Sequence, residues 1–313
     1  MNIPKKLTRG DCVALIAPSS SANAEGLERA IESIKKFGLV PKVYPSCRTN
    51  HGHVAAPDEI RAGDVNDAFL DDEVKGIICI RGGYGTPRIL DKINYQAIAE
   101  NPKLFLGYSD ITGLHSAINK LSKLVTFHGP MPDPAWRDKI VGYTKMHLEK
   151  ALFECGPLGE VKNPAGEQIK TLVPGMAKGK LVGGNLSLLA AALGTPYDVD
   201  CKGNILFIED TGESVYRLDG MFSSMRLAGK LSEAAGIILG TFENCPREKK
   251  SNGFEDLPLQ QVIEEIVKPL GVPTIYNFRA GHNYPQPTLP LGVTVELDAT
   301  NGTIVFTEAH CRE

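Results

Sequence analysis

The sequence has no long hydrophobic run and almost no net charge. No stretch of about 18 apolar residues occurs, so a transmembrane helix is not expected. The 34 basic and 37 acidic side chains leave a formal charge of −3, which gives no reason to expect nucleic acid or an anionic membrane as a partner. A short apolar run at 13–17 ends in a proline and is typical of a strand, not of a signal peptide. We therefore expect a cytoplasmic protein.

Cysteine pairs and metal-binding patterns are also missing. The seven cysteines are an odd number, and neither C-x-x-C nor a zinc-type spacing occurs among them. Reduced, mostly structural thiols are therefore expected, which agrees with a reducing compartment. His51 and His53 form an H-x-H pair in a polar loop, but no third ligand stands nearby in the sequence. We predict no metal and no other cofactor.

The first half of the chain alternates strand and helix signals. Short apolar runs are followed by polar turns, and helical spacing begins after three of these turns. The expected strands lie at 13–17, 39–44, 74–80 and 104–107, and the expected helices at 24–37, 57–70 and 111–121. This alternation predicts an α/β fold with a doubly wound parallel sheet.

The second half shows shorter strand signals and is expected to form a smaller mixed α/β domain. Its strands are expected at 179–182, 205–208, 236–239 and 293–297, and its helices at 185–193, 216–228 and 258–268. Proline and glycine gather between the halves. We therefore place an N-terminal domain at 1–150, a linker at 151–175 and a C-terminal domain at 176–313.

Ser109 has the sharpest local signal for chemistry. It follows a predicted strand and directly precedes a predicted helix, at the edge where open α/β sheets bind ligands. The pattern is similar to the G-x-S-x-G nucleophile elbow, although Ile111 replaces the last glycine. The alternative is that Ser109 only caps the helix, with Asp110 in the favourable first turn.

A glycine-rich segment, RGGYG at 81–85, follows another predicted strand. It fails the dinucleotide fingerprint, because Arg88 stands where the last glycine or alanine belongs, and it lacks the Lys-Ser/Thr of a P-loop. The segment is either a tight turn or a loop whose backbone N–H groups approach a ligand.

A buried carboxylate and a histidine are needed if Ser109 is a nucleophile. Glu209 ends an apolar strand and could orient a histidine, or it could belong to a capped turn together with Asp210. His282 lies between a glycine and a proline-rich loop, which holds it in place and leaves it accessible, as a general base requires. His128, in a turn of the first half, is the rival base.

Taken in order, these motifs resemble the LD-carboxypeptidase family, which includes the microcin C self-immunity proteins. The matching segments are RGGYG at 81–85, GYSD at 107–110, LVGGNL at 181–186, IED at 208–210 with YRLD at 216–219, and GH at 281–282 with LPLG at 289–292. The resemblance implies a flavodoxin-like N-terminal domain, a smaller swivelling β/α C-terminal domain, no metal, and a homodimer. Gly220 stands where we expect the family's arginine.

The resemblance also implies roles for single residues. Ser109 would be the nucleophile, His282 the general base and Glu209 its orienting acid. The backbone N–H of Asp110 and that of Gly82 or Gly83 would form the oxyanion hole.

The implied reaction is hydrolysis of the amide to the terminal D-alanine of murein tetrapeptide, in peptidoglycan recycling. Arg81, Tyr84 and Arg279 neighbour the site loops and are candidates for substrate binding, although each arginine could be structural. A first alternative is a microcin-immunity-like amidase that cleaves peptidyl or aminoacyl sulfamoyl adenylates, with Trp136 as the residue that would stack on adenine. A second is a non-catalytic ligand-binding protein on the same fold.

Overall fold

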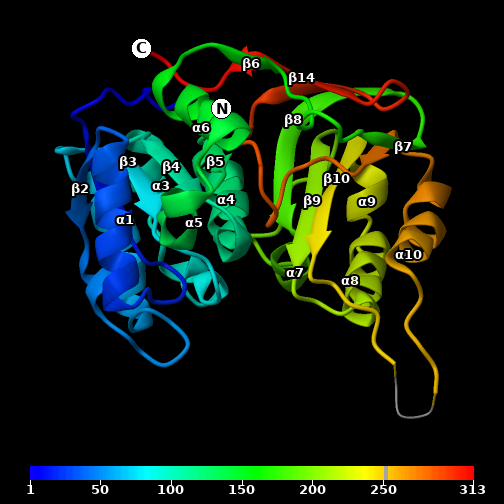
Figure 1. Cartoon of the computed structure of the whole chain (residues 1–313), viewed down its shortest axis with the longest axis horizontal. Coiled ribbons are helices and arrows are strands. Elements are labelled where there is room, and N and C mark those ends of the chain that lie inside the picture. Colours follow the sequence, from blue (N-terminus) through cyan, green and yellow to red (C-terminus); the bar gives the residue numbers. More distant parts are fainter. Residues whose placement is uncertain (250–252) are drawn as a thin grey trace.

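The N-terminal half folds around a six-stranded sheet in the computed structural model, which describes residues 1–249 and 253–313. The strand order is β12-β5-β4-β3-β1-β2. Figure 1 labels β2, β3, β4 and β5 of this sheet. These strands are β1 (Cys12–Ile16), β2 (Val40–Val43), β3 (Val74–Cys79), β4 (Leu104–Gly107), β5 (Thr126–His128) and β12 (Leu289–Leu291). All neighbours are parallel except β12 and β5. The order 2-1-3-4-5 is flavodoxin-like, so the predicted doubly wound sheet is confirmed.

Helices cover both faces of this sheet. They are α1 (Ala24–Lys36), α2 (Asp58–Leu70), α3 (Tyr95–Glu100), α4 (Thr112–Ala117), α5 (Pro132–Asp138) and α6 (Gly142–Phe153). Val13 and Leu15 of β1 share a core with α1, α5 and α6, whereas Ala14 and Ile16 share another with α2, α3 and α4. Because both faces are covered, successive strand residues are all apolar, as the sequence runs show.

The C-terminal half contains an eight-stranded sheet in the order β6-β14-β13-β8-β9-β10-β11-β7. Its strands are β6 (Pro157–Glu160), β7 (Lys170–Val173), β8 (Met176–Asn185), β9 (Ile205–Thr211), β10 (Gly236–Glu243), β11 (Thr274–Tyr276), β13 (Thr294–Asp298) and β14 (Thr303–Ala309). The four central strands, β8 to β11, are parallel, and the outer pairs are antiparallel.

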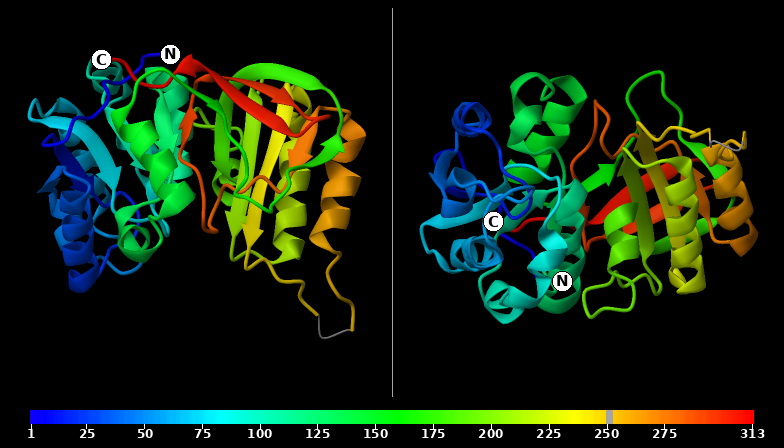
Figure 2. Two further views of the ribbon diagram at one scale, coloured as in Figure 1. Left: turned by 45° about the horizontal axis from the view of Figure 1, so that its top comes forward. Right: turned by 90° about the horizontal axis from the view of Figure 1, so that it is seen from below.

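One face of the second sheet is covered by helices, and the other turns toward the first half (Figure 2). The helices are α7 (Leu186–Ala191), α8 (Val215–Leu227), α9 (Lys230–Glu233) and α10 (Leu259–Ile266). On the opposite face, Phe207 and Ile238 belong to the same apolar cluster as Val13 and Leu15 of β1. A continuous core therefore joins the two halves along their seam.

Shorter helical turns complete the described part of the chain. They are η1 (Pro45–Arg48), η2 (Thr86–Arg88), η3 (Leu90–Lys92), η4 (Ser109–Ile111), the π-helical η5 (Ile118–Ser122) and η6 (Lys268–Leu270). None of the helices in residues 1–249 and 253–313 combines the length and the apolar character that a bilayer crossing requires.

The structure differs from the predicted domain boundaries in two places. The segment expected as a linker at 151–175 holds β6 and β7, the two edge strands of the second sheet. Conversely, β12 lies within the expected C-terminal domain but pairs with β5 of the first sheet, Leu289 opposite His128. These strands are short, and proline or glycine lies within β6 and β12 and directly after β7, so they resemble turns in the sequence.

Candidate active site

Ser109 lies in a strained turn at the carboxyl end of β4. Its φ is +62°, in the left-handed region that non-glycine residues rarely adopt. Glycines make room around it: a Cβ at Gly107 would lie 2.8 Å from the Ile111 side chain, and one at Gly82 would lie 2.9 Å from Ser109 Cβ and 3.1 Å from its Oγ. The chain thus has the geometry of a nucleophile elbow, with Ile111 packed over Gly107.

Asp110 locks this turn to the glycine-rich segment at 81–85. Its carboxylate is buried and accepts hydrogen bonds from the Ser19 hydroxyl and, at 2.9 Å, from the Thr86 N–H. Burial raises the pKa of Asp110 above its ordinary value, and these hydrogen bonds only partly offset that effect. The side chain of Asp110 is therefore structural, and only its backbone N–H is left for chemistry.

Three backbone N–H groups beside Ser109 are unused. Within the described residues, those of Gly82, Gly83 and Asp110 donate to no protein acceptor. Gly83 has a φ of +114°, and a Cβ there would collide with the Ser20 hydroxyl. Glycine is therefore required at this approach, and the free donors suit an oxyanion.

Glu209, on β9, and His282, in the loop between β11 and β12, form a hydrogen-bonded pair. Glu209 is buried on β9, and its Oε2 lies 2.7 Å from His282 Nδ1, although 73 residues separate them in sequence. A Cβ at Gly281 would lie 3.0 Å from the same Oε2, so this glycine lets the chain approach the carboxylate. Burial lowers the pKa of His282, but the carboxylate of Glu209, together with smaller effects of Asp210 and Glu243, outweighs burial and raises the pKa above its ordinary value.

The hydrogen bond assigns the tautomer of His282. A carboxylate accepts, so Nδ1–H donates to it and Nε2 is left with a lone pair. The imidazole ring lies against the ring of Tyr108, with centroids 4.9 Å apart, and Tyr108 directly precedes Ser109. In the described residues the Ser109 hydroxyl has no hydrogen-bond partner, so its proton transfer to His282 stays a prediction.

The seam beside these residues is held by hydrogen bonds of the LVGGNL segment at 181–186. Asn185 belongs to this segment and lies at the end of β8. Its backbone N–H donates to Thr112 Oγ1 at 3.0 Å, and its side-chain amide donates to Asp210 at 2.9 Å. A Cβ at Gly184 would lie 2.5 Å from Thr112 Oγ1. This glycine cluster thus joins the two halves.

His128 is not a competitor for the role of base. Its side chain is completely buried on β5, and neither ring nitrogen has a partner in the described residues. Burial lowers its pKa well below the ordinary value, so the ring stays neutral. The ring packs edge-on against the rings of Phe207 and Tyr108, so His128 is a residue of the packed core.

Trp136 does not fit the predicted adenine-stacking role. It is only 5% exposed, its indole donates to the Pro130 carbonyl at 2.8 Å, and its ring lies 4.8 Å from that of Phe37. The proline-rich stretch reads as a turn in the sequence, but α5 forms there and packs against α1. The tertiary contact therefore removes the ring from solvent.

The predicted substrate-binding residues differ in availability. Arg81 is 40% exposed, and its hydrogen bonds within the described residues are long, 3.4 Å to the Ser21 carbonyl and 3.5 Å to Asp133. Tyr84 is 47% exposed beside the oxyanion glycines. Arg279 instead donates to the Tyr284 carbonyl at 2.9 Å and pairs with Glu167.

Two remaining expectations concern metals and Gly220. Among the described residues, no group of three or more His, Cys, Asp or Glu side chains could hold a metal ion. A Cβ at Gly220, on α8, would meet nothing within 4 Å, so space does not demand glycine there. The position lies outside the contacts that hold Glu209 and His282.

A serine elbow with free N–H donors, next to a buried Glu–His pair, is the arrangement of a two-domain α/β hydrolase of the serine type. Residues 13–129 match the LD-carboxypeptidase N-terminal domain, and residues 178–297 match the LD-carboxypeptidase C-terminal domain. The chain is 40% identical to the "Probable murein peptide carboxypeptidase" of Bacillus subtilis over 97% of this chain and 93% of that protein. The chain therefore belongs to the LD-carboxypeptidase family and is a carboxypeptidase-type hydrolase.

Two further relatives show the range of this family. The crystal structure of muramoyltetrapeptide carboxypeptidase from Oxalobacter formigenes matches with a TM-score of 0.79 and 30% identity, over 94% of this chain and 97% of that one. The microcin C7 self-immunity protein MccF of Escherichia coli is 27% identical over 80% of this chain and 78% of its own length. A structure of MccF in complex with aspartyl sulfamoyl adenosine has a TM-score of 0.87 at 23% identity, over 100% of both chains, which shows a shared fold.

Proposed function

We propose that this protein is a serine LD-carboxypeptidase that removes the terminal D-alanine from murein tetrapeptide. The observation that carries the proposal is the buried Glu209–His282 pair, 2.7 Å between oxygen and nitrogen, against the turn that bears Ser109. The names of the Bacillus and Oxalobacter relatives support the substrate.

In the first step, His282 Nε2 takes the Ser109 proton while the hydroxyl oxygen attacks the amide carbonyl. Glu209 keeps the imidazole oriented and stabilises its positive charge. The carbonyl oxygen becomes an oxyanion, which the N–H groups of Asp110 and of Gly82 or Gly83 hold. One such donor typically contributes about 3–4 kcal/mol to lowering the barrier.

In the second step, the tetrahedral intermediate collapses and His282 gives its proton to the nitrogen of the leaving D-alanine. The remaining acyl group is an ester on Ser109. A water molecule, deprotonated by the same imidazole, attacks this ester and releases the tripeptide. The serine hydroxyl is then restored.

An exopeptidase must also bind a free carboxylate, and we assign this role to Arg81 with Tyr84. A guanidinium binds a carboxylate through two parallel hydrogen bonds. The Arg81 side chain is accessible and weakly paired, and Arg81 directly precedes Gly82 and Gly83, the glycines proposed for the oxyanion hole. Arg279 has its own protein partners and is the weaker candidate.

Release of D-alanine tests this function. The protein is incubated with purified murein tetrapeptide, without added metal, and free D-alanine is measured. Ser109→Ala should abolish release, whereas Ser232→Ala, at an exposed serine on α9, should leave it unchanged. Wild-type protein that releases no D-alanine would overturn the proposed substrate.

A microcin-immunity-like amidase remains the alternative within the family, because MccF is among the relatives. The burial of Trp136 removes the aromatic side chain that we expected for adenine. Side-by-side rates on murein tetrapeptide and on an aspartyl sulfamoyl adenylate decide between the two. Labelling by a fluorophosphonate that disappears in Ser109→Ala would rule out a non-catalytic binding protein.

The family resemblance also carries two proposals about the cellular state. We propose that the enzyme works in the cytoplasm, where murein peptides return for recycling, and that it is a homodimer. Light scattering on a sizing column measures the second point. A mass near the chain's 33.8 kDa would contradict the dimer.

A further inference from the structure

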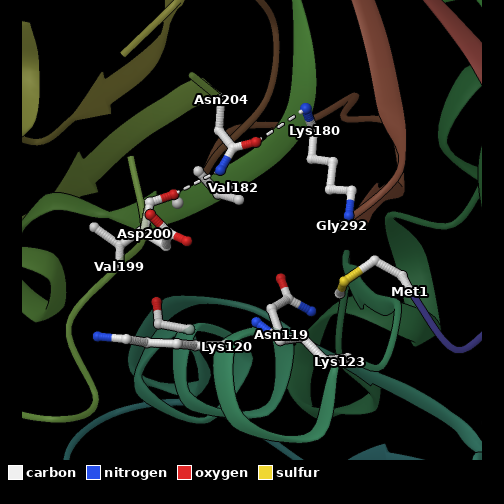
Figure 3. A pocket seen from close by; sticks show the side chains of 12 residues that line it. Met1, Asn119, Lys120, Lys123, Lys180, Val182, Val199, Asp200, Asn204 and Gly292 are labelled. Atoms are coloured by element: carbon white, nitrogen blue, oxygen red, sulfur yellow. Dashed lines mark hydrogen bonds between the residues drawn. The ribbon is translucent and has the colours of Figure 1, made fainter. Parts of the chain in front are cut away.

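A cavity lies in the seam between the two halves, and the proposed triad does not line it. Its volume is about 280 Å³, near the lower end of ligand pockets, which span roughly 300–1,000 Å³. Its walls come from α4 and η5 of the first half, β8 of the second half, and Gly292, where the chain crosses from β12 to β13 (Figure 3). Of the described residues that line it, none belongs to the triad or the oxyanion hole.

The charges on these walls favour an anion. Lys123 follows η5, and Lys180 reaches from β8 toward Gly292, so the two lysines stand on different halves (Figure 3). Neither has an ion-pair partner in the described part of the chain. Glu308 interacts electrostatically with Lys180, but its carboxylate already accepts the Thr294 N–H at 3.0 Å.

Two other charged side chains, those of Lys120 and Asp200, line the cavity. Lys120 is paired with Asp198 at 2.6 Å. Asp200 lies beside Asn204, whose amide donates to the Asp200 carbonyl at 2.9 Å (Figure 3). The walls therefore offer two ammonium groups without an ion-pair partner and the carboxylate of Asp200. The Asn204 amide is already engaged, because its Oδ1 accepts the Lys180 backbone N–H at 3.3 Å and its Nδ2 donates to Asp200 (Figure 3).

Ser116 supplies an independent sign of a ligand. It lines the cavity, is only 8% exposed, and its hydroxyl has no partner among the described residues. A buried polar group normally has a hydrogen-bond partner, because burial removes its hydrogen bonds to water and the protein must replace them. A bound molecule would satisfy this hydroxyl.

We propose that this cavity binds a small phosphorylated molecule, with its phosphate between Lys123 and Lys180 and in reach of Ser116. Lysine binds phosphate as a compact charge. The hydroxyl or amino groups of the same molecule would face the carboxylate of Asp200. This proposal does not depend on the carboxypeptidase reaction.

Such a ligand would couple the two halves at the site. Helix α4 begins three residues after Ser109. At the end of β8, Asn185 lies opposite Glu209 of the neighbouring strand β9. A phosphate held by Lys123 on one half and Lys180 on the other favours the orientation in which both reach it. A ligand shifts a conformational equilibrium by its difference in affinity for the two states.

Calorimetric titration with inorganic phosphate tests the site, at constant ionic strength kept with sodium chloride. We expect saturable binding that Lys123→Gln and Lys180→Gln each weaken at least fivefold. Lys145→Gln, at an exposed lysine on α6, is the matched control and should leave the affinity unchanged. Acetate should bind more weakly than phosphate; equal or tighter acetate binding would overturn the phosphate assignment.

Ser116→Ala separates ligand binding from folding. Because the hydroxyl has no protein partner, its removal should leave the melting temperature unchanged or raised, and yet weaken phosphate binding. Hydrogen exchange should show phosphate-dependent protection at 112–123 and 178–185. Absence of saturable binding, or equal binding by the wild type and both lysine variants, would overturn the site.

Discussion

Glu209→Gln offers the most direct test of the proposed charge relay. The substitution keeps the size of the side chain, and its amide oxygen can still accept the Nδ1–H of His282. It removes the negative charge 2.7 Å from the imidazole, at a position with no solvent exposure. We therefore expect a folded protein with an intact pocket and a weakened general base.

The size of the effect follows from the charge that this hydrogen bond loses. A hydrogen bond to a charged group contributes about 1.5–3 kcal/mol. The transition state carries the imidazolium, and about 1.4 kcal/mol corresponds to a tenfold change in rate. The plateau of kcat/KM should therefore fall about 10- to 150-fold, and further if the amide turns and misorients the ring.

The same substitution should also shift the pH profile of kcat/KM. In the wild type the carboxylate raises the pKa of His282 against the lowering effect of burial. Without the charge of Glu209, only the smaller effects of Asp210 and Glu243 oppose burial, so the pKa of His282 falls and the acidic limb of kcat/KM moves to lower pH. A rate that is lower everywhere, with the limb at a more acidic pH, is the expected result.

The assay is D-alanine release from murein tetrapeptide between about pH 4 and pH 9, with kcat/KM determined at each pH. Glu264→Gln, at an exposed glutamate on α10, is the matched control and should reproduce the wild-type profile. An acidic limb that stays in place or moves to higher pH would refute the assigned relay, as would an undiminished plateau.

Three further substitutions test single contacts. Gly82→Ala should abolish D-alanine release, because the new Cβ would lie 3.1 Å from Ser109 Oγ; activity above a tenth of wild type would contradict this. Trp136→Phe should lower the free energy of unfolding in urea by about 1–3 kcal/mol, because the Pro130 carbonyl loses its donor, with kcat/KM unchanged. His128→Leu should keep activity and stability, since the buried ring has no hydrogen bonds to lose; loss of turnover in a folded variant would reopen its role as base.

Much of the first half could be predicted from local pattern. The apolar runs at 13–17, 74–80 and 104–107 correspond to β1, β3 and β4, because strands buried on both faces need uninterrupted apolar residues. The helix expected at 24–37 forms as α1, with Asn23 as its cap accepting the Gly26 N–H. Spacing and caps act over a few residues, and they are visible in a single sequence.

The edges of the sheets were harder to predict. β6 and β7 lie in the segment that we expected as a linker, and Pro290 interrupts β12. Each of these strands has three or four residues, and each is stabilised by its neighbour in the sheet more than by its own pattern. A partner strand more than a hundred residues away leaves no local signal.

The sequence by itself determined which residue types were available for the chemistry: a serine at a strand-to-helix turn, glycines that free backbone donors, and a carboxylate at a strand end. Only the tertiary structure decided that Glu209 meets His282, that His128 and Trp136 are buried, and that a cavity opens between Lys123 and Lys180. The physical reason is range. Strand and turn preferences come from neighbouring residues, whereas burial and charge pairing depend on how the two sheets pack against each other.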